Sequence, residues 1–327
     1  MRRLSPKLSP WLEDVHKNLA TMVADGFKPT AISAREGLTE TIRAMVLDKP
    51  VIAWVNDELV TGREYSVPVR IYHPAPDEAR PVLIFYHGGG GTAGSVWAYD
   101  PIARKIAAAT GHIVVSVEYR LAPENPYPAG VTDAYAVVCG VWDALERRSL
   151  KYQRTLSVSG DSAGGALACM VSSLAQFHPE VTIANQILIY PCLDYTLRLA
   201  SIEENAENYF LTKDRITWYM DYYFQHGENR FEASPLYQKY TSALPRTLMI
   251  TAEFDPLRDD GYEYLKQLDQ VGVEYEHLHL HDLVHAYLFM DKLIEEECTH
   301  TYESMARFLN HEKLTKPPGA LQATAVE

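Results

Sequence analysis

Residues 155–171 read TLSVSGDSAGGALACMV, and this stretch decides the fold. It places a G-x-S-x-G motif, residues 160–164, between a short run that favours β structure and an apolar run that permits a helix. A serine at such a strand-to-helix turn is typical of a nucleophile elbow. Glycine is needed on both sides of the serine because side chains there would collide in so tight a turn. The motif predicts that the hydroxyl of Ser162 stands clear of a sheet, at the N-terminus of a helix.

Strand and helix candidates alternate along the rest of the chain. The expected strands are residues 67–73, 82–86, 113–119, 155–159, 186–190, 247–252 and 274–280. The expected helices are residues 99–109, 132–148, 163–176, 259–270 and 293–310. Several strands are continuously apolar, such as VLIFY at 82–86, which is typical of strands covered on both faces. The alternation predicts the α/β class, with a mostly parallel central sheet and helices on both faces.

Two stretches do not fit this alternation. Residues 1–60 favour helix, and residues 195–235 form an insertion rich in aromatic residues. We expect both to build a helical cap over a pocket at the active-site end of the sheet, the alternative being an ordinary packing subdomain. The catalytic domain is then residues 61–194 and 236–315, and residues 316–327 form a C-terminal tail.

The composition limits the class of protein. The net charge of −13 argues against a nucleic-acid partner, because such partners require clustered Lys and Arg. No apolar run follows Arg2 and Arg3, so we expect no signal peptide, no membrane span and a cytoplasmic location. The four cysteines are widely spaced, which predicts free thiols. An outer strand at 274–280 makes a homodimer possible.

A run of glycines follows an apolar strand, where residues 86–91 read YHGGGG. Consecutive glycines let backbone N–H groups converge on one point, as an oxyanion requires. We expect Gly88 and Gly89 to donate, with the N–H of Ala163 as the third donor. The alternative is a flexible or phosphate-binding loop, but the motif of such loops is missing. His87 is interpreted as a residue that fixes this loop.

A nucleophilic serine needs a base, and the base needs a carboxylate that orients it. In a fold of this kind the acid and then the base follow the nucleophile along the chain. Asp255, just past the strand at 247–252, is the candidate acid, and His285 is the candidate base. His281 is the rival base.

Three histidines alternate on one expected strand, at His277, His279 and His281. Alternate residues of a strand share a face, so these three could hold a metal ion. The plainer interpretation is a strand near the edge of the sheet, and we expect no metal site.

Taken together, these motifs resemble the hormone-sensitive lipase family of α/β hydrolases, also called bacterial family IV esterases. The segments that carry the resemblance are HGGG at 87–90, YRLAPENPYPA at 119–129 with Asp133, GDSAGG at 160–165, and DPLRD at 255–259 with His285. The resemblance covers residues 65–310 and implies an α/β-hydrolase fold, a helical cap, a carboxylic ester hydrolase activity and no cofactor. It also implies the catalytic triad Ser162, Asp255 and His285 and the oxyanion donors Gly88, Gly89 and Ala163.

Two details of the motifs carry further expectations. The family's glycine motif is usually followed by an aromatic residue, and Gly91 stands in its place, which predicts a looser pocket wall. Within the proline-rich segment, we expect Arg120 and Glu124 to pair.

The function expected is hydrolysis of small, short-acyl carboxylic esters through an acyl-enzyme. The alternatives are an amidase or peptidase on the same scaffold, or a non-catalytic receptor for a small ligand.

Overall fold

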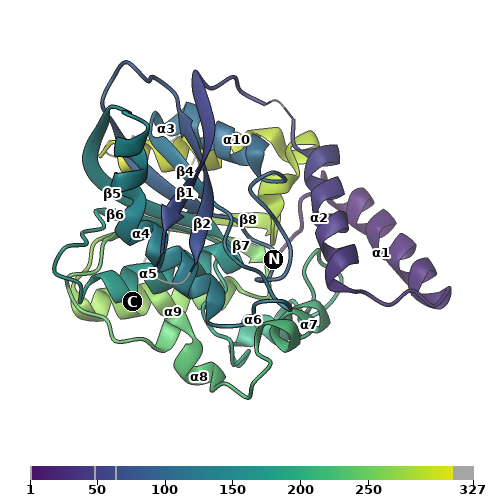
Figure 1. Ribbon diagram of the computed structural model, residues 1–327. Coiled ribbons are helices and arrows are strands. Elements are labelled where there is room, and N and C mark those ends of the chain that lie inside the picture. Colours follow the sequence, from purple (N-terminus) through teal and green to yellow (C-terminus); the bar gives the residue numbers. More distant parts are fainter. Residues whose placement is uncertain (1, 48, 63–64, 312–327) are drawn as a thin grey trace.

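A single mixed sheet forms the centre of the computed structural model, which describes residues 2–47, 49–62 and 65–311 (Figure 1). In the described chain the sheet has eight strands, in the order β1-β2-β4-β3-β5-β6-β7-β8. The strands are β1 (Trp54–Thr61), β2 (Ser66–His73), β3 (Arg80–Tyr86), β4 (Ile113–Val117), β5 (Tyr152–Asp161), β6 (Asn185–Ile189), β7 (Arg246–Phe254) and β8 (Tyr275–Val284). Only β1 with β2 and β2 with β4 pair antiparallel, and the other pairs are parallel.

Helices cover both faces of this sheet (Figure 1). The helices of one face are α3 (Asp100–Thr110) and α10 (Asp291–Leu309), and those of the other are α4 (Ala129–Arg147), α5 (Ala163–Ala175) and α9 (Arg258–Val271). The side chains of β3 alternate between the two cores. Leu83 and Phe85 pack with α3 and α10, whereas Val82 and Ile84 pack with α4 and α5. Both faces are therefore buried, and the expected α/β class is confirmed.

The first strand was missed by the sequence analysis. Residues 54–60 were assigned to the N-terminal helical part, but they form most of β1, which pairs with β2 at the edge of the sheet. Asn56 and Asp57 are exposed there, so β1 lacks the continuous apolar pattern of the central strands. The expected tail, residues 316–327, lies outside the described residues.

In the ranges that the structure describes, five α-helices lie outside the sheet layers, and they belong to the two stretches expected to form a cap. They are α1 (Ser9–Ala24), α2 (Ala31–Met45), α6 (Ala200–Glu204), α7 (Lys213–Tyr223) and α8 (Arg230–Ala233). The two stretches touch: the rings of Trp11 and Phe210 are 5.4 Å apart, and His16 Nε2–H donates to the carbonyl of Tyr209 at 3.2 Å. Figure 1 shows α1 and α2 (purple) beside α7.

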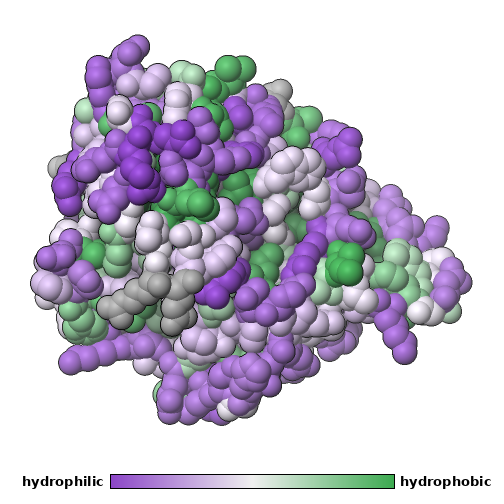
Figure 2. Space-filling model, viewed as in Figure 1, coloured by the Kyte–Doolittle hydropathy of each residue, from purple (hydrophilic) through white to green (hydrophobic). Residues whose placement is uncertain are grey.

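Some apolar side chains of α1 and α2 remain exposed at this end of the molecule. They are Leu19, Met22, Val23 and Ile32. Figure 2 shows apolar residues among polar ones at the α1 end, on the right. None of the helices in the described ranges is both long enough and apolar enough to cross a membrane.

The proline-rich segment is held by ion pairs other than the one expected. Arg120 donates from its backbone N–H and its guanidinium to the buried carboxylate of Asp133, at 2.8–3.1 Å. Glu124 instead pairs with Arg35 of α2, at 2.6 and 2.9 Å. Arg35 also donates to the carbonyl of Thr92 at 2.9 Å, so α2 is tied to the segment that follows the glycine run.

We predict that Asp133→Ala lowers the free energy of unfolding by about 3 kcal/mol, because it removes the buried carboxylate that accepts hydrogen bonds from the backbone N–H and the guanidinium of Arg120. Urea denaturation measures this change. The control is Asp143→Ala, an exposed residue of the same helix, which should change stability by about 0.5 kcal/mol or less. Equal effects of the two substitutions would contradict the structural role of Asp133.

Candidate active site

Ser162 lies at a sharp turn between the end of β5 and the start of α5. Its φ of 54° and ψ of −119° lie in a sparsely populated region, which costs about 1–3 kcal/mol. The turn is held by the Ser162 N–H, which donates to the carbonyl of Ile189 at 2.9 Å. A Cβ on Gly160 would overlap the backbone of Gly164, and one on Gly164 would overlap the carbonyl of Tyr86. The flanking glycines are therefore required by close backbone packing.

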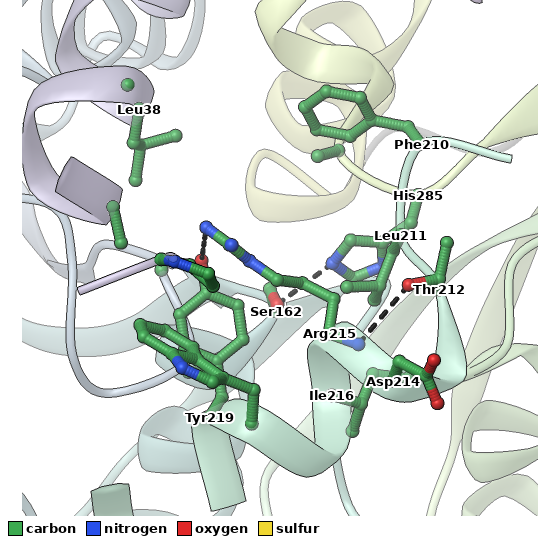
Figure 3. Close-up of a pocket in the computed structure, with 18 of the residues that line it drawn as sticks. Leu38, Ser162, Phe210, Leu211, Thr212, Asp214, Arg215, Ile216, Tyr219 and His285 are labelled. Carbon is green, nitrogen blue, oxygen red and sulfur yellow. Dashed lines mark hydrogen bonds between the residues drawn. The ribbon is translucent and has the colours of Figure 1, made fainter. Parts of the chain in front are cut away.

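Three predicted residues meet at this turn. His285 Nδ1–H donates to Asp255 Oδ2 at 2.7 Å, and the Ser162 hydroxyl lies 2.9 Å from His285 Nε2 (Figure 3). Asp255 is fully buried at the end of β7, where it also accepts the N–H of Leu257 at 2.8 Å. With Nδ1 protonated toward the carboxylate, Nε2 is free to accept the serine proton.

The rival base His281 does not reach the site, since it is exposed on β8 and does not line the pocket around Ser162. His277 and His279 each lie 2.8 Å from the hydroxyl of Thr251, and His279 also pairs with Glu253. Over the described ranges, no group of three or more His, Cys, Asp or Glu side chains has an arrangement that could hold a metal ion.

Asp161 joins the serine turn to the glycine run. Its carboxyl is fully buried and accepts the N–H of Gly88 at 2.8 Å and the hydroxyl of Tyr99 at 3.1 Å. Burial raises the pKa of Asp161 to about 7. Since the Gly88 N–H is already bound to Asp161, the prediction that Gly88 donates to an oxyanion is wrong.

Gly89 and Gly90, the next two residues of the glycine run, have the properties expected of oxyanion donors. Gly89, Gly90 and Ala163 all line the pocket that contains Ser162, whereas Gly88 does not. Within the described chain, no hydrogen bond is recorded from the N–H groups of Gly89, Gly90 or Ala163. Gly90 was not among the donors predicted from the sequence, because a run of four glycines leaves open which N–H groups face Ser162.

The wall expected to be loose at Gly91 is filled by the insertion. Gly91 has φ of +68°, and a Cβ there would lie 2.8 Å from the ring of Tyr223. A Cβ on Gly90 would overlap the ring of Tyr219. Both tyrosines belong to α7, so their rings pack directly against the glycine run. The prediction of a looser wall is wrong because the aromatic surface comes from another segment.

His87 is fully buried behind this loop. Its Nδ1–H donates to the carbonyl of Gly88 at 2.8 Å, and its ring stacks on Tyr119 at 4.5 Å. Burial lowers the pKa of His87 to about 4, so the ring is neutral at pH 7. These contacts agree with the interpretation of His87 as a residue that fixes the loop.

A cavity of about 930 Å³ opens above Ser162. Its walls are predominantly apolar and come from α1, α2 and α7, together with the glycine run and the loop that carries His285. A cavity of this size and character is typical of a small-molecule site. The arrangement combines a serine, a base, a carboxylate and free backbone N–H groups, which is what nucleophilic acyl transfer requires.

Comparison with known proteins places this arrangement in a family. A family model described as alpha/beta hydrolase fold matches residues 83–289. The chain therefore belongs to the α/β-hydrolase family, as a member of its hormone-sensitive lipase-like branch. Several of the relatives are named as ester hydrolases, and the chain is an enzyme of that class.

Two curated relatives and one solved structure illustrate the similarity. Carboxylic ester hydrolase LipN of Mycobacterium tuberculosis is 36% identical over 73% of this chain, and the match spans 65% of LipN, slightly less than two thirds of its length. Ethyl acetate hydrolase of Pseudomonas putida is 31% identical over 74% of this chain and 78% of its own length. The structure of the hyperthermophilic esterase of Pyrobaculum calidifontis has a TM-score of 0.84 and 32% identity, covering 94% of this chain and 98% of that one.

The raised pKa of Asp161 predicts a pH-dependent stability. The folded state holds this proton more tightly, with a pKa of about 7 against the ordinary 3.8. Stability is therefore lost as pH rises from about 4 to about 7, and it is level above that range. Because an asparagine side chain would not titrate, the unfolding free energy of Asp161→Asn relative to wild type should rise over this range, by about 4 kcal/mol at most. Urea denaturation at a series of pH values measures the difference; a constant difference would contradict the shift.

Proposed function

We propose that the protein is a serine carboxylesterase in which Ser162 is the nucleophile, His285 the general base and Asp255 the residue that orients the base. The observation that carries the proposal is the continuous hydrogen-bonded chain Ser162–His285–Asp255 at the floor of the cavity. Ser162 attacks the ester carbonyl while His285 Nε2 takes the hydroxyl proton. His285 then gives this proton to the leaving alcohol, and a water molecule repeats the sequence on the acyl-enzyme.

The oxyanion donors proposed are the N–H groups of Gly89, Gly90 and Ala163. This set replaces Gly88 by Gly90, because the N–H of Gly88 is bound to Asp161. The Ala163 N–H also stands at the N-terminus of α5, where the helix dipole favours negative charge. Donors of this kind act on the charge that develops in the transition state, and each contributes about a hundredfold or more in rate.

The substrates proposed are small esters with short acyl groups. Tyr219 and Tyr223 pack against Gly90 and Gly91, which limits the space beside the proposed oxyanion donors. The name of one relative, ethyl acetate hydrolase, also supports a preference for small esters with short acyl groups. The alternative of a non-catalytic receptor is less well supported, because such a receptor would lack the catalytic base. Here His285 is present, 2.9 Å from the serine hydroxyl.

Labelling with a fluorophosphonate tests the nucleophile. We expect intact-protein mass spectrometry to show one adduct, and peptide mapping to place it on Ser162. Ser162→Ala should abolish the adduct and lower kcat for p-nitrophenyl butyrate by at least about 10⁴-fold. The control Ser66→Ala changes an exposed serine of β2 and should leave both measurements unchanged. Retention of activity in Ser162→Ala would refute the mechanism.

The acyl preference is tested with p-nitrophenyl acetate, butyrate, hexanoate, octanoate and palmitate. We expect kcat/KM to be highest among acetate, butyrate and hexanoate and to fall for the longer chains, because Tyr219 and Tyr223 limit the space beside the proposed oxyanion donors. A maximum at palmitate would refute the proposed size limit while leaving the triad proposal intact.

A further inference from the structure

Arg215 brings a positive charge into a mostly apolar cavity. It lies on α7, and it lines the same cavity as Ser162 and His285. Figure 3 shows its side chain extending from α7 into the cavity, toward the region in front of Ser162. The helix fixes its starting point, since the Arg215 N–H donates to the hydroxyl of Thr212, the N-cap residue, at 3.2 Å.

The contacts of the guanidinium are with aromatic residues. It lies 4.9 Å from the ring of Trp218 and 5.0 Å from the ring of Tyr219, and it donates to the Tyr219 hydroxyl at 3.3 Å. Among the residues that the structure describes, no carboxylate lies within ion-pair distance of Arg215. Arg258, by contrast, pairs with Glu204, Glu253 and Asp259.

The carboxylates and histidines of the wall are already engaged or point elsewhere. Asp161 accepts from Gly88 and Tyr99, His285 is bound to Asp255, and His16 donates to the carbonyl of Tyr209. The remaining one, Asp214, is exposed, and in Figure 3 its carboxylate points away from the guanidinium. Within the part of the chain that the structure describes, the cavity therefore holds a half-buried cation that no neighbouring anion balances.

We propose that Arg215 makes the enzyme selective for esters that carry a second, anionic group, a carboxylate, on the acyl or the alcohol chain. This inference rests on the proposed function, since Ser162 must attack the ester bond of the same molecule. A guanidinium presents a planar fork of N–H donors that matches a carboxylate in two parallel hydrogen bonds. The pairing is strengthened by the apolar walls, where charges are poorly screened. A neutral ester of the same length gains nothing from Arg215.

Matched pairs of esters, which differ only by a terminal methyl or carboxylate, test this inference. Methyl hexanoate and monomethyl adipate place the carboxylate on the acyl side. Pentyl acetate and 5-acetoxypentanoate place it on the alcohol side. The quantity measured is the ratio of kcat/KM for the anionic ester to that for its neutral partner, by titration of the acid released at constant pH. For the wild type, we expect a ratio above one for one of the two pairs, and the pair that gives it identifies the side.

Variants of Arg215 then show whether this side chain causes the selectivity for the anionic ester. Arg215→Gln should lower the ratio for that pair by about tenfold to a hundredfold, mainly through KM, as the loss of charge-assisted hydrogen bonds requires. Arg215→Lys keeps the charge without the fork and should give an intermediate ratio. The control Arg198→Gln removes an exposed arginine outside the cavity and should leave the ratio unchanged.

Three results would overturn the inference: a wild-type ratio of one or less for both pairs, an unchanged ratio in Arg215→Gln, or an equal fall in Arg198→Gln. If Arg215 only packs against Trp218 and Tyr219, its substitution lowers the rates for both members of a pair together and the ratio stays constant. Failure of the proposed function is distinguished by the neutral esters, because wild type would then fail to hydrolyse them or Ser162→Ala would still do so.

Discussion

The hydrogen bond from the Gly88 N–H to the buried carboxyl of Asp161 joins the two turns on which the site depends. One turn follows β3 and carries the glycine run, and the other follows β5 and carries Ser162. These strands are neighbours in the sheet, with Tyr86 opposite Gly160. The register of the pair therefore brings the glycine run beside Ser162, and Asp161 links the two turns by its hydrogen bond to Gly88. A buried side chain that does no chemistry thus sets the geometry in which chemistry can occur.

Local sequence patterns predict those parts of the fold that depend on neighbouring residues. The central strands can be recognised from their apolar runs, because both of their faces are covered. The turn at Ser162 can be recognised from its motif, because the turn needs its glycines. β1 lacks such an apolar run, since an edge strand needs only one buried face. Asp255 and His285 could be selected as candidates because they follow the serine in the order that the strands set, and a chain of hydrogen bonds joins both to Ser162 in the structure.

Long-range contacts decide what the sequence could not show. Whether Gly88 or Gly90 faces the nucleophile depends on the register of β3 against β5 and on the position of Asp161. The spacing of Arg120 and Glu124 suggested a local pair, but the folded chain brings Asp133 to Arg120 and Arg35 to Glu124. In the same way, the rings that pack against Gly90 and Gly91 come from α7, more than a hundred residues along the chain.

The contact between α1 and the insertion has a consequence for how the molecule assembles. His16 and Tyr209 lie 193 positions apart in sequence, so bringing them together requires the closure of a very long loop. The strands that carry Ser162 meet over shorter separations and are buried on both faces. The sheet thus positions Ser162 and the glycine run, whereas part of the cavity wall above them forms only when the first helix docks onto a much later segment. The two parts meet where Tyr219 and Tyr223 of α7 pack against Gly90 and Gly91, so a change in the sequence of α7 reaches the glycine run directly.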